Sequence, residues 1–142
     1  MQKLIEQAEA EGVGVAWHDF GGDTLGLYVY DDIPMIGIDK SIKDNLFLSR
    51  CVLAEELGHH FTSVGRSIYY CRSLRNINVC KSEHKALRWA AWYLIPRGSI
   101  KLALLDGADT VKKMAHYFRV TEEMIWFRLR IREKLSDQAI VN

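Results

Sequence analysis

The hydrophobic period of this chain changes near Asp44, and that change limits the folds that the chain can adopt. Residues 1–12 carry the pattern of a short amphipathic helix. Apolar residues then alternate with small or polar ones in 13–20, 25–31 and 35–39, which is the period of β-strands. From about Asp44 they recur every three or four positions, as in α-helices. The sequence therefore predicts an α+β fold: a small N-terminal antiparallel sheet packed on a central helix, followed by further helices.

Length and composition are those of a single-domain globular protein. The chain has 142 residues, 49% of them hydrophobic, with 19 Lys and Arg against 18 Asp and Glu. The net charge of +1 argues against polyanion binding over the whole surface, although a local basic patch stays open. There is no apolar run of the ~18 residues that a membrane helix needs, and no secretion signal at the start. Because the three cysteines are also an odd number, we expect a cytoplasmic protein without a membrane segment.

The helical part is expected to contain one long helix and several shorter ones. Ser41 or Asp44 is the predicted N-cap of the long helix. Residues 64–80 show no clear period, which predicts a long irregular segment. We expect residues 1–100 to form the core and residues 101–142 a helical extension of the same compact unit. The later helices are predicted at 82–95, 99–105, 109–118 and 121–135.

The chemistry of the chain is concentrated in the segment Leu53–His60, which reads LAEELGHH. Glu55 and His59 are four residues apart and therefore share one face of a helix. Glu56 and His60 form a second such pair, rotated by about 100°. These groups are costly to bury unless they bind an ion or pair with one another. Two interpretations are open at this point: a metal site, or two Glu–His pairs on a solvated face.

A further acidic residue comes from the next predicted helix, where Glu83 lies in the first turn. Together with Glu55 and His59 it supplies three protein ligands, as in catalytic zinc sites that leave a fourth position for water. Glu56, beside this face, can then accept a proton from that water. An alternative register takes Glu56 and His60 as ligands and Glu55 as the base.

Two segments resemble the signature motifs of the ImmA/IrrE family of metallo-endopeptidases. LAEELGHHFT is similar to the zincin helix of that family. SEHKALRWAAWYLIP is similar to its second motif, a Glu-x-x-Ala-x-x-(Phe/Trp)-Ala run that ends in Pro. The predicted order of helix, sheet and helix also agrees, over roughly residues 13–100. The resemblance implies a zincin-like fold and metal-dependent cleavage of peptide bonds.

The resemblance also implies roles for individual residues. His59 matches the second of the family's two histidine ligands, Glu56 matches its general base, and Glu83 matches its downstream ligand. Glu55 stands where the family has its first histidine, and a carboxylate also binds zinc. With two ligand charges, Mn²⁺ or another divalent ion competes better with Zn²⁺. The implied site therefore has Glu56 as catalytic residue and Glu55, His59 and Glu83 as metal ligands.

A substrate class is implied in the same way. Relatives that accompany phages or mobile elements cleave helix-turn-helix repressors, so the resemblance implies a protein substrate of that kind. An extended peptide is expected to pair with an open edge of the strand 35–39; the other interpretation is that this is an inner strand. Because Glu55 replaces a histidine, the alternative function is a catalytically silent zincin-fold protein that binds a transcriptional regulator.

Nucleic-acid binding is a further hypothesis, based on two groups of basic residues. The helices predicted at 109–118 and 121–135 faintly resemble a helix-turn-helix. The other interpretation of the basic residues is a solvated face, or a cleft that attracts an acidic peptide. They are Arg66, Arg72, Arg75 and Lys81 in the first group, and Lys112, Lys113, Arg119, Arg128, Arg130 and Arg132 in the second.

Overall fold

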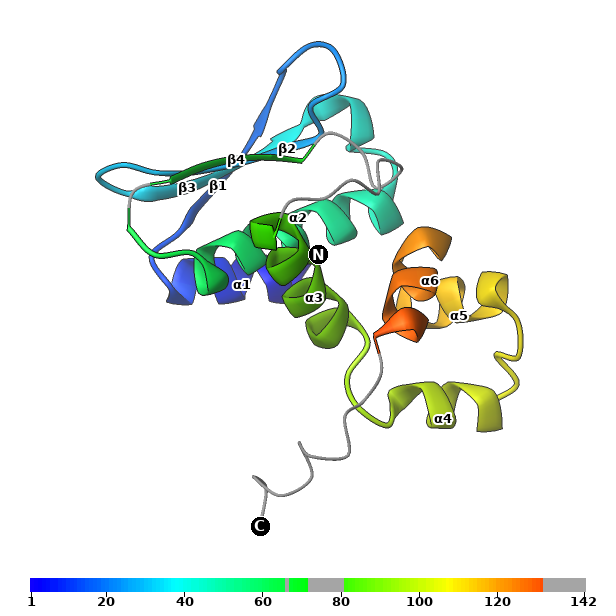
Figure 1. Cartoon of the computed structure of the whole chain (residues 1–142). Coiled ribbons are helices and arrows are strands. Elements are labelled where there is room, and N and C mark those ends of the chain that lie inside the picture. The colour runs from blue at the N-terminus through cyan, green and yellow to red at the C-terminus, as the bar shows by residue number, and fades with distance from the viewer. Residues whose placement is uncertain (66, 72–80, 132–142) are drawn as a thin grey trace.

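The computed structural model is built around one long helix, α2, with a sheet on one side and helices on the other (Figure 1). It describes residues 1–65, 67–71 and 81–131. The helices are α1 (Gln2–Ala10), the 3-10 helix η1 (Lys40–Ile42), α2 (Leu46–Thr62), α3 (Lys81–Leu94), α4 (Ser99–Leu105), α5 (Val111–Phe118) and α6 (Glu122–Arg130). The strands are β1 (Gly14–His18), β2 (Gly26–Tyr30), β3 (Pro34–Asp39) and β4 (Ser67–Cys71). The predicted α+β class and the central position of the motif helix are confirmed.

The sheet is mixed rather than wholly antiparallel. Its strand order is β1-β3-β2-β4, and β2 runs antiparallel to both β3 and β4. β1 pairs in parallel with β3, so the prediction of an antiparallel sheet is wrong for this pair. The reason is that β3 lies between β1 and β2, which follow one another in the sequence. Alternation shows which residues face the core, but it does not show which strands become neighbours.

Two further expectations about strands are settled by the structure: whether residues 35–39 form an edge, and whether residues 64–80 are irregular. Residues 35–39 belong to β3, which is an inner strand, so they offer no open edge to a peptide. β4 lies within the segment 64–80, for which an irregular conformation was predicted. Its conformation comes from pairing with β2, a tertiary interaction that the local sequence pattern does not report. The remainder of that segment, residues 66 and 72–80, lies outside the described residues.

The start of α2 is capped by Asn45, one residue after the predicted Asp44. The side-chain oxygen of Asn45 accepts a hydrogen bond from the backbone N–H of Leu48 at 3.1 Å. Ser41, the other predicted cap, lies instead in η1, where its N–H donates to Asp39 at 2.9 Å. From Cys51 to His59 every residue of α2 is buried, because the helix is covered by the sheet, α1 and α3. None of the described helices is long and apolar enough to cross a membrane.

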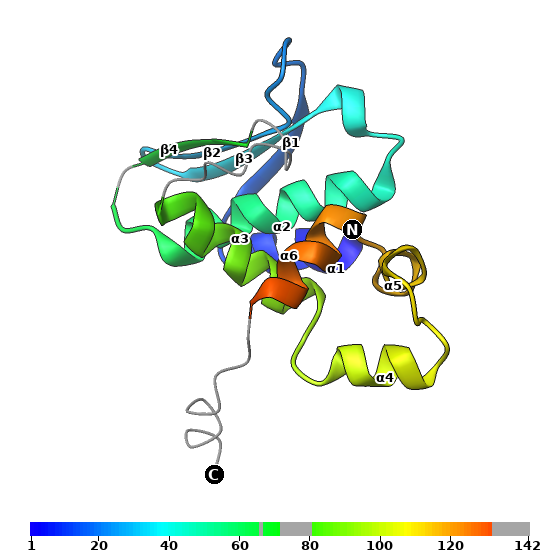
Figure 2. The same cartoon turned by 45° about the vertical axis from the view of Figure 1, so that its right-hand side comes forward.

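Of the last three helices, α6 packs on α3, α5 packs on α6, and α4 lies farther out and contacts α5 (Figure 2). Arg50 of α2 donates from Nη1 to the carbonyl oxygens of Phe118 and Arg119, both at 3.0 Å, at the end of α5. Arg128 of α6 donates from Nε to the carbonyl oxygen of Ile95 at 2.9 Å and lies 3.7 Å from the ring centre of Trp92. These contacts tie the last helices to the part of the chain that carries the motifs.

A glycine allows α2 and α3 to pack at very short range. A Cβ atom at Gly58 would overlap the backbone carbonyl group of Ala86. The backbone of α3 cannot yield as a flexible side chain would, so only glycine fits here. This contact holds the start of α3, and with it Glu83, near the middle of α2.

We expect Gly58→Ala to lower the free energy of unfolding by about 2–3 kcal/mol, because the added methyl group forces two helices apart. Urea denaturation followed by circular dichroism measures this loss. Gly14→Ala is the matched control: its Cβ meets only the side chain of Met35, which is 43% exposed and can move. Equal losses in the two variants would show that the helix contact is not the cause.

Candidate active site

The acidic and histidine residues of the first motif lie in the buried middle of α2. Glu55 is 6% exposed, Glu56 is fully buried and His59 is 1% exposed. The interpretation of two Glu–His pairs on a solvated face is therefore wrong. Buried ionisable groups of this kind are costly unless other charges or ligands compensate them. Their burial makes this part of α2 the strongest candidate for a functional site.

Glu56 projects from α2 toward β2. A Cβ atom at Gly26 would lie 2.6 Å from Oε1 of Glu56, so the carboxylate occupies space that any larger residue at that position would fill. Among the described residues, no side chain donates a hydrogen bond to either carboxylate oxygen. Burial raises the pKa of Glu56 well above its ordinary value, and the negative charges of Glu55 and Glu83 raise it further. Hydrogen bonding by the backbone of Tyr28 acts to lower this pKa. Glu56 is thus a carboxyl group with an unusually high affinity for a proton.

Glu83 lies in the first turn of α3 and is half-buried. Its charge reaches Glu56, as the charge of Glu55 does, so three carboxyl groups from two helices act on one another. Mutual repulsion of this kind, at low local dielectric, favours a proton or a cation among them. The structure therefore brings Glu83 into the electrostatic surroundings of the motif on α2.

His59 supplies a neutral imidazole to the same region. Burial lowers its pKa from 6.5 to about 4, because the surrounding protein disfavours the charged ring. At neutral pH the ring therefore carries no charge, which is the state in which histidine binds metal ions.

The donor set can be compared with the predicted metal site. Within the described residues, no three His, Cys, Asp or Glu side chains lie in position to hold one ion together. The ligand set Glu55, His59 and Glu83 therefore stays a prediction. The chemistry of these donors nevertheless suits a divalent cation, since a neutral imidazole accompanies carboxylates that repel one another.

His60 points away from this set. Its Nδ1 lies 2.9 Å from the hydroxyl oxygen of Tyr28 on β2, and its Nε2 lies 4.0 Å from a carboxylate oxygen of Glu11 after α1. Both ring nitrogens are thus directed at other elements, which favours the register with Glu55 and His59 over the register with Glu56 and His60.

Sequence reasoning did not identify Gly26 or Tyr28 as part of the site. Tyr28, in the strand predicted at 25–31, is 1% exposed, and its hydroxyl group lies 2.9 Å from Nδ1 of His60. The available signal was a glycine followed two residues later by a tyrosine, on the same face of a strand. That signal is weak until the strand is known to lie against α2.

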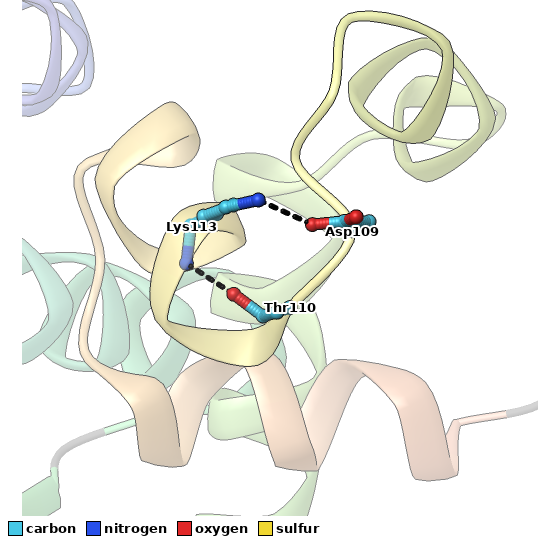
Figure 3. Close-up of polar contacts among 3 residues, drawn as sticks. All are labelled: Asp109, Thr110 and Lys113. Atoms are coloured by element: carbon cyan, nitrogen blue, oxygen red, sulfur yellow. Dashed lines mark hydrogen bonds and ion pairs between the residues drawn. The ribbon is translucent and has the colours of Figure 1, made fainter.

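Two residues of the second basic group are engaged within the protein, which weakens the hypothesis of a nucleic-acid surface. Arg128 is 3% exposed and engaged with α3, and Lys113 forms an ion pair with Asp109 at 2.7 Å (Figure 3). Helices α5 and α6 follow one another closely, but α6 begins with exposed Glu122 and Glu123, which would repel phosphate groups. Residues 66, 72, 75 and 132 lie outside the described residues, and so does the side chain of Lys81.

We expect His59 to make stability depend on pH. Its folded pKa of about 4 lies below the unfolded value of 6.5, so protonation favours the unfolded chain as the pH falls. The stabilisation is complete above pH 6.5 and is lost as the pH falls through about 4.

The measurement compares wild type with His59→Gln in urea at a series of pH values. The difference in their unfolding free energies should change by about 2–3 kcal/mol between pH 7 and pH 4, in favour of the variant at low pH. Glu56 also makes the unfolding free energy depend on pH, but with the opposite sign, because its pKa is raised in the folded protein. Most of that contribution is common to both proteins and cancels in the difference. Parallel pH profiles of the two proteins would contradict the expectation.

Comparison with known proteins identifies the family. The family model described as the IrrE N-terminal-like domain, a peptidase family, matches residues 8–130, which include both motifs, the sheet and α6. No match to this chain is found among the curated proteins or among the solved structures.

Proposed function

Because the chain belongs to the IrrE N-terminal-like domain family of peptidases, we propose that it is a metal-dependent endopeptidase whose active site lies on α2. The observation that carries this proposal is the burial of Glu56 beside Glu55 and within reach of the charge of Glu83. A structural protein gains nothing from such a group, whereas a hydrolase needs a carboxylate that binds and releases a proton.

Glu55, His59 and Glu83 are the residues that would hold the cation, with Zn²⁺ as the first candidate and Mn²⁺ or another divalent ion as the alternative. When bound, the ion would supply electrostatic polarisation of the peptide carbonyl group and of water. Its positive charge would also offset the repulsion among the carboxylates that raises the pKa of Glu56.

Glu56 is the proposed catalytic residue. Its carboxylate accepts the proton of the attacking water molecule and delivers it to the nitrogen of the leaving amine. A raised pKa suits this role, because the group must hold the proton between the two steps. Burial keeps bulk water from that proton and strengthens the local electrostatic interactions.

The proposed substrate is a helix-turn-helix repressor of a phage or mobile element. This part of the proposal rests on the resemblance of the two motifs to those of ImmA/IrrE endopeptidases. Such a substrate is a protein of the cytoplasm, which would place this chain in the same compartment.

The proposal predicts that Glu56→Gln abolishes cleavage, by about a thousandfold or more, without abolishing metal binding. The test incubates the purified protein, loaded with zinc or manganese, with the repressor encoded nearest to its own gene. Mass spectrometry detects the fragments, and elemental analysis measures the bound metal. Tyr117→Phe is the control for general effects of mutation, because it removes an exposed hydroxyl group that donates to Asp106, just after α4.

The same assay separates the alternative function. A wild-type protein that binds the repressor but neither cleaves it nor takes up a metal would be a regulator-binding protein without catalysis. Equal cleavage by wild type and Glu56→Gln would instead remove Glu56 from the mechanism.

We also expect Glu55→His to change the metal preference. The variant replaces a charged oxygen donor by an imidazole, so it should favour zinc over manganese by about tenfold more than wild type does. Competition dialysis with both ions, followed by elemental analysis, measures the ratio. An unchanged ratio would mean that Glu55 is not a ligand.

A further inference from the structure

The helix-facing side of β2 is the surface against which Glu56 lies. Gly26 and Tyr28 are the buried residues of β2, while Leu27 and Val29, which alternate with them along the strand, are only half-buried. A side chain at Gly26 would meet both Oε1 of Glu56 and Cγ1 of Val52 at 2.6 Å. The absent side chain of Gly26 therefore defines the space that the carboxylate occupies.

Tyr28 fixes the next turn of α2. Its hydroxyl group lies 2.9 Å from Nδ1 of His60, which follows Glu56 by four residues and shares its helix face. Tyr28 is fully buried and His60 is partly buried, so water competes little for this contact. It limits rotation of α2 about its own axis, and such a rotation would swing Glu56 away from β2.

These two contacts matter because, within the described residues, no side-chain hydrogen bond holds the carboxylate of Glu56. Its position is instead set by the surfaces around it. A catalytic group that is misplaced by about 1 Å loses much of its effect, so those surfaces determine the rate.

We propose that Gly26 and Tyr28 are positioning residues for Glu56: Gly26 leaves room for the carboxylate, and Tyr28 holds the helix face that carries it. This inference rests on the proposed function, since it concerns the same proton-transferring group. Neither residue touches the reacting atoms; both act through Glu56.

The first test is Gly26→Ala, assayed with the metal-loaded protein on the repressor that wild type cleaves. We expect kcat to fall at least about tenfold, with KM within about twofold and the metal content unchanged. The control is Gly14→Ala, which adds the same methyl group to β1, where it meets the side chain of Met35 and not Glu56. An unchanged kcat in Gly26→Ala, or an equal fall in Gly14→Ala, would overturn the proposal for Gly26.

A double variant distinguishes positioning from general damage. Glu56→Asp withdraws the carboxylate oxygens by one methylene group, which relieves the overlap with Oε1 at 2.6 Å. The added methyl group would still meet the Cγ position of residue 56 at 3.1 Å and Cγ1 of Val52 at 2.6 Å. Gly26→Ala should therefore lower kcat by a smaller factor in the Glu56→Asp background than in wild type. Multiplication of the two losses would show that they are independent, and would contradict positioning.

Tyr28→Phe keeps the ring and removes the contact with His60, so it tests the second residue even if Gly26→Ala folds poorly. We expect kcat to fall about fivefold. Tyr117→Phe also removes a tyrosine hydroxyl contact, but an exposed one with Asp106, and it should keep the wild-type rate. Wild-type kcat in Tyr28→Phe would remove Tyr28 from the proposal.

Crystal structures of wild type and Gly26→Ala provide a readout that needs no activity. A shift of the Glu56 carboxylate by about 1 Å or more supports the positioning contact. An unmoved carboxylate overturns it. If wild type cleaves nothing under any metal condition, the proposed function fails, and the crystallographic comparison still decides whether Gly26 sets the position of Glu56.

Discussion

The charge in the middle of α2 is the constraint on which the rest of the structure depends. Glu55, Glu56 and His59 are buried in a helix that is covered by other elements, and Glu83 adds a further carboxylate from α3. An arrangement of this kind lowers stability unless a proton or a cation joins it. The surrounding elements are shaped to permit it: Gly26 gives the carboxylate of Glu56 its space, and Gly58 lets α3 approach. These two glycines therefore make room for buried charge that by itself lowers stability.

Features that depend on neighbouring residues can be predicted from this sequence, whereas features that depend on contacts between distant segments cannot. The spacing of Glu55 and His59 is a property of one helix, so the shared face and the central helix follow from the sequence. β4 and the parallel pairing of β1 with β3 depend on contacts between distant segments, which no local period reports. The role of Gly26 could not be predicted for the same reason. It depends on the position of Glu56, which lies against Gly26 only in the folded chain.

Arg128 and His60 show that residue type alone does not reveal a role. Arg128 belongs to a run of alternating basic residues that resembles a binding surface, yet it is buried against Trp92 and the end of α3. His60 neighbours His59 and has the same ionisable ring, yet it connects α2 to Tyr28. In both cases the direction of the side chain decides between structure and chemistry. That direction is set by which element packs on which face.

Arg50 has a consequence for attempts to isolate the motif-bearing part of the chain. Its guanidinium group donates to the carbonyl oxygens of Phe118 and Arg119, and the neighbouring Cys51 accepts the N–H of Thr121 at 3.5 Å. A recombinant fragment that stopped at residue 100 would deprive both residues of these partners and would remove Arg128, which donates to the carbonyl oxygen of Ile95. The two motifs are complete by that point in the sequence, but the contacts that support their helices are not.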